Sequence, residues 1–434
     1  MEKKKQNSWI PNFGGKGWLM VLLGVCYYYI YMNMFNIDLN TLYGVYEEQY
    51  GWTTPQVSLV VSIGGWIAAL GVIFFGAVCK KKGPKFVSVT GLFMTAVALV
   101  IAGVASNFAL FTIAVILFFF SAIAFGIIGV AQFGANWFPR GKGHYMGWVT
   151  QGITIGSATL NLVLIAVLPH GGLKTYFFIF AGVSVVLALF TLLTKDYPEQ
   201  AGVYPDNDKS SDRAELDAQL AALEAYKKQS PWTVGKCLKT PATWLIIAGW
   251  SLPMFLATGT MAQLVPALIS FGHSPMFGIG LLTALWPFGV LGNYIGGVID
   301  AKYGAKPSTF VVVAFLVAAS LGLSFAGSNP VLATIAVAMF MFSISVCTNM
   351  TMSITVQVYG RADFENAWPV VSFAQKLIMS AGLVVIALVA SASSYKLAFI
   401  FIAAVAAVAG IFVGLTPSKQ ITPDVDAPKA VEAE

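Results

Sequence analysis

Long apolar segments recur along the chain and are separated by short polar stretches. Each segment is about 20 residues long and apolar on all sides, which is typical of a helix that crosses a bilayer. The pattern predicts an all-α membrane protein with twelve membrane-spanning helices. Their expected bounds are 17–42, 56–79, 86–106, 108–136, 146–168, 175–194, 242–269, 276–300, 308–327, 330–353, 367–390 and 395–415.

The composition supports this interpretation. Of the 434 residues, 57% are hydrophobic and 10% are charged, and the mean hydropathy is +0.76. Soluble domains carry about 25% charged residues, so a large soluble enzyme is excluded. The first apolar run, which begins near Gly17, is longer than the core of a signal peptide. We therefore interpret it as a retained span.

Lysine and arginine lie mostly on one side of the predicted spans. If the N-terminus is inside, the opposite side holds only Lys174 and Lys396. Cytoplasmic loops of membrane proteins are enriched in these residues, so both chain ends are expected in the cytoplasm. The same enrichment explains the net charge of +6, and no nucleic-acid partner is expected.

One long polar stretch divides the spans into two groups of six. This arrangement is typical of secondary transporters, whose binding sites lie near the middle of the membrane between repeats. The last residues of the chain are rich in Ala, Pro and acidic groups, which predicts a disordered tail. The expected units are a six-helix bundle over 1–194, a cytoplasmic linker over 195–239, a second six-helix bundle over 240–416 and the tail over 417–434.

The linker contains a charged segment, residues 212–229, that predicts a short helix. Leu216, Leu220 and Leu223 recur there at helical spacing. We expect this helix to rest on the inner face of the protein, although a regulatory or partner-binding role stays open.

The loops after the second and eighth spans share one pattern. They read GAVCKKKGPK from Gly76 and GVIDAKYGAK from Gly297. Both resemble the GxxxDRxGRR loop of the major facilitator superfamily, a basic turn between two helices. The resemblance is degenerate, because the usual aspartate position holds Lys80 in one copy and Ala301 in the other, with Asp300 shifted by one. The residues expected to latch one conformation are Gly76, Lys80, Gly83, Asp300, Lys302 and Gly304.

Three further segments resemble one subgroup of that superfamily. WFPRGKGHYMG at 137–147 is similar to the WFPxxRGxAxG pattern of the oxalate/formate antiporters and the related monocarboxylate transporters. CLKTPATW at 237–244 and YGRADF at 359–364 are similar to the LKTPxFW and YGxxxF elements of that group. The resemblance covers about residues 15–415. It implies the major facilitator fold and transport of an organic anion by alternating access.

Lys376 lies well inside the eleventh predicted span. An ionisable group in mid-membrane costs at least about 2.5 kcal/mol, so it must face water, a partner or a substrate. In the oxalate/formate group a lysine of this span binds substrate, and Lys376 falls at the matching place. The alternative is that Lys376 only pairs with Asp38 or with a backbone carbonyl.

The same group usually has an arginine in the eighth span, within a G-R-x-x-x-G pattern. Here the segment reads GNYIG from Gly292, so the arginine position holds Asn293. One lysine with a neutral amide suits a monoanion, or a larger molecule with one charged end, better than oxalate. Asn293 either donates hydrogen bonds to the substrate or only packs two helices together.

Asp38 is a carboxylate near the outer end of the first span. Desolvation would favour its protonated form, so it could carry a coupling proton or pair with Lys376. Alternatively it caps the span at the membrane surface. Aromatic and amide side chains could line the site, although packing is the simpler role for each: Tyr28, Tyr31, Trp250, Trp286, Trp368, Gln132, Gln151 and Gln263.

No GxxxxGKS loop, nucleophile elbow or HExxH motif occurs, so we expect no enzyme, cofactor or metal. The sequence favours a transporter of a monocarboxylate or related anion, coupled to protons or to a counter-anion. We expect a monomer in the cell membrane, and the short loops and the resemblance suggest a bacterial inner membrane. Two alternatives stay open: a proton-coupled transporter of a neutral or cationic compound that uses Asp38, and a non-transporting ligand sensor.

Overall fold

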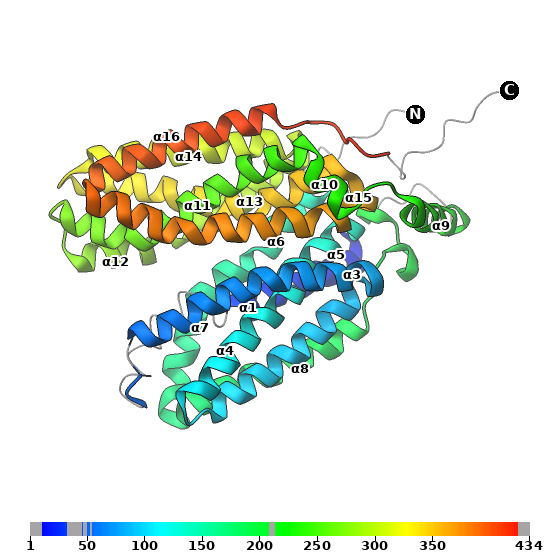
Figure 1. Cartoon of the computed structure of the whole chain (residues 1–434), viewed down its shortest axis with the longest axis horizontal. Coiled ribbons are helices and arrows are strands. Elements are labelled where there is room, and N and C mark those ends of the chain that lie inside the picture. Colours follow the sequence, from blue (N-terminus) through cyan, green and yellow to red (C-terminus); the bar gives the residue numbers. More distant parts are fainter. Residues whose placement is uncertain (1–10, 33–45, 47–49, 53, 208–212, 424–434) are drawn as a thin grey trace.

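The computed structural model describes residues 11–32, 46, 50–52, 54–207 and 213–423. Within these residues the chain forms helices joined by short turns, and no strand occurs among them (Figure 1). The expected all-α class is therefore confirmed. The helices of the first bundle are α1 (Gly14–Met32), α3 (Thr54–Val104), α4 (Phe108–Ile123), the π-helix η1 (Ala124–Gly129), α5 (Val130–Trp137), α6 (Lys142–Val149), α7 (Gln151–Val167), η2 (Leu168–His170) and α8 (Gly172–Leu192).

The second bundle follows a linker of short elements. The linker contains η3 (Glu199–Ala201), η4 (Pro205–Asn207), α9 (Arg213–Gln229) and α10 (Val234–Lys239). The helices of the second bundle are α11 (Pro241–Ser270), α12 (Pro275–Ala284), α13 (Trp286–Tyr303), α14 (Ala305–Ala326), α15 (Pro330–Ala392) and α16 (Tyr395–Leu415).

Two of these helices are each broken by one glycine. Gly83 in α3 has φ +82° and Gly360 in α15 has φ +66°. Glycine adopts this left-handed conformation without the cost that a Cβ brings, so the chain reverses within a single residue. Each of the two helices therefore supplies two consecutive spans.

Eight helices in the described part of the chain are long and apolar enough to cross a membrane, and the two broken helices are among them. Each predicted span coincides with a helix, with half of a broken helix, or with consecutive short helices. The outer end of the first predicted span, residues 33–42, lies outside the described residues. The hydropathy pattern thus located the helices correctly wherever the structure describes them.

The two bundles approach each other at one end and separate toward the other (Figure 1). The linker helices α9 and α10 lie at the end where the bundles meet. We call it the inner end, because the lysine-rich turns that are expected in the cytoplasm also lie there. Apolar side chains of α15, including Met352, Phe364 and Trp368, join the core of the first bundle.

Close backbone contacts hold this junction. A Cβ on Gly297 of α13 would lie 2.6 Å from the carbonyl oxygen of Gly143 in α6. A Cβ on Gly76 of α3 would lie 2.8 Å from the Cβ of Pro369 in α15. Small residues let membrane helices approach this closely, so glycines of both repeated loops sit where the bundles touch.

A linker helix forms over Arg213–Gln229, close to the predicted 212–229, and its Leu223 is buried. The chain after α16 differs from the prediction. Residues 417–423 were expected in a disordered tail, but Ile421 N donates a hydrogen bond to the carbonyl oxygen of Val358 (2.9 Å). The break at Gly360 leaves backbone acceptors of α15 unpaired within the helix, and this segment uses them.

Candidate functional site

Lys376 of the second bundle reaches Tyr31 of the first. Its Nζ donates a hydrogen bond to the hydroxyl of Tyr31 at 2.8 Å and lies 5.5 Å from the centre of the Tyr31 ring. Tyr31 is 5% exposed, whereas Lys376 is partly exposed. A cation on the second half of α15 is thus held against an aromatic residue of α1, although the two residues are 345 positions apart.

Tyr28 supports this contact from one turn earlier on α1. The rings of Tyr28 and Tyr31 meet edge to face, with centroids 6.1 Å apart. Residues three positions apart share a helix face, and Gly152 of α7 leaves room for Tyr28, because a Cβ there would lie 3.0 Å from the Tyr28 Cβ. Lys376, Tyr31 and Tyr28 therefore form one group at the bundle interface.

This group has the donors that an anion requires. The Tyr31 hydroxyl accepts a hydrogen bond from the Lys376 ammonium, so its own proton can point to another acceptor. A carboxylate placed beside the pair could accept from both Lys376 and Tyr31. Hydrogen bonds between an ammonium and a carboxylate are about twice as strong as neutral ones.

Asn293 lies in a different inter-bundle contact. It is 2% exposed, its Nδ2 donates to Oγ1 of Thr154 (3.2 Å), and its Oδ1 accepts from Nδ2 of Asn349 (3.2 Å). The indole of Trp286 donates to the backbone oxygen of the same Thr154 at 3.0 Å. Asn293 and Trp286 thus attach α13 to α7.

Of the other predicted lining residues, Gln151 of α7 also bonds α13, since its Nε2 donates to the backbone oxygen of Val290 (3.2 Å). Gln132 and Gln263 instead bond within their own bundles. Gln132 donates to Asn136 in the same helix (3.1 Å), toward the inner end. Gln263 accepts a hydrogen bond from Tyr395 (3.1 Å), which joins α11 to α16 within one bundle. Asp38, the candidate proton carrier, lies outside the described residues.

Several polar residues near the site were not singled out from the sequence. Gln375 donates to Oγ1 of Thr351 at 2.6 Å, directly beside Lys376. Thr154 on α7 and Asn349 on α15 complete the contact of Asn293. Thr351 and Asn349 are polar residues that interrupt the apolar tenth span, and this interruption could have indicated them as site residues. Thr154 carried no such signal, because a threonine is ordinary in its helix.

A dense polar network closes the inner end. Four members of this network, Arg361, Asp363, Glu365 and Asn366, lie on the second bundle, where the second half of α15 begins. We call these four residues the inner hub. Arg361 forms two hydrogen bonds with Glu199 (2.8 and 2.9 Å). The other partners of the inner hub are Tyr226 for Asp363 (2.8 Å), Lys227 for Glu365 (2.7 Å) and Lys80 for Asn366 (2.8 Å).

The two repeated loops take part in the same closure. Lys80 and Gly76 of the first copy contact α15. In the second copy Asp300 is buried against α6, where a Cβ on Gly143 would lie 2.7 Å from Oδ2 of Asp300. Gly83 and Gly304 form the turns with φ +82° and +91°, and Lys302 lies at the end of α13.

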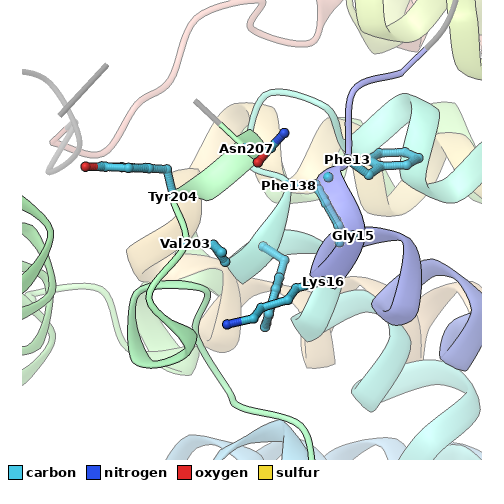
Figure 2. A pocket seen from close by; sticks show the side chains of 10 residues that line it. Phe13, Gly15, Lys16, Phe138, Val203, Tyr204 and Asn207 are labelled. Atoms are coloured by element: carbon cyan, nitrogen blue, oxygen red, sulfur yellow. The ribbon is translucent and has the colours of Figure 1, made fainter. Parts of the chain in front are cut away.

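A small pocket lies between the start of α1 and the linker (Figure 2). Phe13, Phe138, Val203 and Asn207 are among its lining residues. The ammonium of Lys16, also in this lining, donates to the backbone oxygen of Ala201 at 2.6 Å. The contact attaches α1 to the linker, so we interpret the pocket as a packing seam.

Comparison with known proteins gives the following matches. The model of the family described as Major Facilitator Superfamily matches residues 20–364. The MFS-type transporter pytF of Aspergillus terreus is 26% identical over 160 residues, 36% of this chain and 52% of that protein. The probable sulfoacetate transporter SauU of Cupriavidus necator is 25% identical over 305 residues, 65% of each protein. The chain thus spans between half and two thirds of these relatives.

Solved structures with a similar backbone cover nearly the whole chain. The human organic anion transporter MFSD10 has a TM-score of 0.69 at 15% identity and covers 95% of this chain and 100% of its own. The fucose:proton symporter FucP of E. coli has a TM-score of 0.63 at 15% identity, with coverage of 92% and 98%. At such low identity these likenesses show the fold alone.

Proposed function

The chain belongs to the major facilitator superfamily, and from this membership we propose that it is a secondary transporter of a small organic anion. It is a multi-pass membrane protein of a family of transporters, not of enzymes. In our proposal the anion binds at Lys376 between the two bundles, which move around it in alternation.

The contact between Lys376 and Tyr31 is the observation that supports this proposal. It places a cation of one bundle against a hydroxyl of the other, 2.8 Å away. An anion that accepts from both groups would bind to both bundles at once. Binding and the relative movement of the bundles would then be coupled through one ligand, because each bundle supplies one donor.

The chemistry around Lys376 favours a monoanion. Asn293 stands where the resembling transporters have a second cation, and its amide already bonds Thr154 and Asn349. Two similar proteins are named for sulfoacetate and for organic anions, which supports an anionic substrate in general. The monocarboxylate class, and coupling to protons or to a counter-anion, belong to our proposal.

The contacts of the inner hub indicate to which side of the membrane the binding site opens in this arrangement. Lys80 of the first bundle bonds Asn366 there, and the linker residues Glu199 and Lys227 bond Arg361 and Glu365, so a route to the inner side requires these contacts to separate. The bundles diverge toward the opposite end (Figure 1). We therefore propose that this arrangement receives its anion from the outer side.

Uptake by proteoliposomes tests the proposal, with labelled acetate, lactate, pyruvate and sulfoacetate as substrates. We expect at least one of the monoanions acetate, lactate and pyruvate to enter through the wild-type protein, and Lys376→Gln to abolish that uptake. Entry of the dianion sulfoacetate alone would contradict the monoanion class. Lys174→Gln is the matched control, because Lys174 lies at the outer start of α8, near Phe178. Wild-type uptake by Lys376→Gln, or no uptake of any of the four anions by the wild type, would overturn the proposal.

A further inference from the structure

We propose that the π-helix η1 is the element that positions Tyr31 for the anion, and that Gly126 is its positioning residue. This inference rests on the proposed anion transport. It concerns residues that bind nothing themselves but determine where the hydroxyl beside Lys376 lies.

The π-helix interrupts the fourth span. Residues Ala124–Gly129 lie between α4 and α5, and the N–H of Val130 bonds the carbonyl oxygen of Phe125, five residues earlier. Such wider turns are rare, and where they occur inside α-helices they are frequently found at functional sites. Here the wide turn faces α1, because Phe125 packs against Tyr27 with ring centroids 5.7 Å apart.

Gly126 brings the Tyr31 ring directly onto the backbone of η1. A Cβ on Gly126 would overlap this ring, since it would lie 2.8 Å from the Cγ of Tyr31 and 3.1 Å from its Cβ. No larger residue fits without moving Tyr31. The hydroxyl of Tyr31 is at the far end of the same ring, so a tilt at Gly126 displaces the atom that contacts Lys376.

The next residue of η1 binds the helix that carries Lys376. The indole of Trp368 donates a hydrogen bond to the carbonyl oxygen of Ile127 at 3.2 Å. Trp368 precedes Lys376 by about two helical turns, or about 12 Å along the axis. The π-helix therefore holds Tyr31 on one side and the second half of α15 on the other, and so sets the spacing between the phenol and the ammonium.

The test compares transport kinetics with whichever of acetate, lactate, pyruvate or sulfoacetate the wild type takes up. We expect Gly126→Ala to raise KM on the order of tenfold with little change in maximal rate, which is the effect of losing one hydrogen bond to a charged group. Gly182→Ala on α8 is the matched control, because a Cβ there meets nothing within 4 Å.

A double-mutant cycle separates this role from general packing. Tyr31→Phe should raise KM by a similar factor, and adding Gly126→Ala to Tyr31→Phe should raise it no further, because the hydroxyl is already absent. If Gly126→Ala instead caused a general packing defect, the factors by which the two substitutions raise KM would multiply in the double variant. Trp368→Phe, which removes the bond to Ile127, should also raise KM and provides a second measurement if Gly126→Ala fails to fold.

These experiments distinguish a failure of this inference from a failure of the proposed function. If Lys376→Gln transports like the wild type, anion binding at Lys376 is wrong, and this inference fails with it. If Lys376→Gln is inactive while Gly126→Ala and Trp368→Phe keep the wild-type KM, only this inference is overturned. Effects of Gly126→Ala and Tyr31→Phe that multiply would also overturn it.

Discussion

Arg361 and Glu199 form a bidentate ion pair across the inner end, with side chains that are 2% and 0% exposed. Glu199 belongs to the linker that follows the first bundle, and Arg361 begins the second half of α15. Removing one partner of a buried pair leaves an uncompensated charge and costs about 3–5 kcal/mol. This pair is therefore the strongest single candidate for holding the inner end closed.

The first prediction is that Glu199→Gln opens the inner end. Cys79 is buried near the inner hub, and its alkylation by N-ethylmaleimide, with the other cysteines replaced by serine, reports the opening. We expect the rate to rise on the order of tenfold or more. Glu224→Gln, on the exposed side of α9, is the control. An unchanged rate in Glu199→Gln would show that other contacts keep the end closed.

The second prediction concerns pH and the linker. Asp206 accepts hydrogen bonds from the backbone N–H groups of Arg140 (3.0 Å) and Gly141 (2.7 Å), just before α6. Burial raises the pKa of Asp206 to about 6, although these hydrogen bonds act in the opposite direction. The folded protein thus binds this proton more tightly than the unfolded chain, whose pKa is lower.

The sign of the effect follows from linkage. The contribution of Asp206 to stability is present at low pH and is lost as pH rises through about 6. The midpoint of thermal unfolding should therefore be higher at pH 5 than at pH 7.5, and Asp206→Asn should reduce the difference. Asp217→Asn on the exposed surface of α9 is the control. A difference that Asp206→Asn leaves intact would assign the pH dependence to other groups.

Hydropathy predicted most of the fold because each span must hide its backbone from lipid within one helix. The sequence also led to Lys376, since a charge in an apolar span has few explanations. It could not predict that Arg361 pairs with Glu199, because the two residues are 162 positions apart and pair only through the packing of the bundles. Both lie in polar segments, where a charge is unremarkable.

The candidate site was predicted only in part for a related reason. Periodicity indicates that a residue lies in a span, but not which neighbour its side chain meets. Gln132 was a candidate lining residue, yet it bonds Asn136 one turn away in its own helix. Thr154 was overlooked, although it accepts from Asn293 across the bundle interface. The π-helix has no marker in the sequence beyond Gly126 and Gly129.

The third prediction separates the two roles that the sequence left open for Asn293. If Asn293 only joins helices, Asn293→Leu removes its hydrogen bonds to both Thr154 and Asn349, whereas Thr154→Val removes only the first, so Asn293→Leu should destabilise the protein more than Thr154→Val. Hydrogen bonds between membrane helices contribute about 0.6 kcal/mol on average, and the double variant should lose no more stability than Asn293→Leu alone. A raised KM in Asn293→Leu alone would instead assign Asn293 to the substrate.

The last prediction concerns the segment after α16. Ser418 accepts a hydrogen bond from Gln357 (2.8 Å), Ile421 donates to Val358 (2.9 Å), and Thr422 donates to the backbone oxygen of Tyr359 (2.6 Å). All three bonds lie just before the break of α15 at Gly360. Residues 417–423 therefore brace the turn from which the inner hub begins.

Truncation after Thr416 should lower the midpoint of thermal unfolding and speed the alkylation of Cys79. Each lost hydrogen bond contributes about 0.5–1.5 kcal/mol, so the midpoint should fall by several degrees. Truncation after Pro423 is the matched control, because it keeps all three bonds and should behave like the full chain. Equal midpoints for the two truncated proteins would show that this segment does not brace the break.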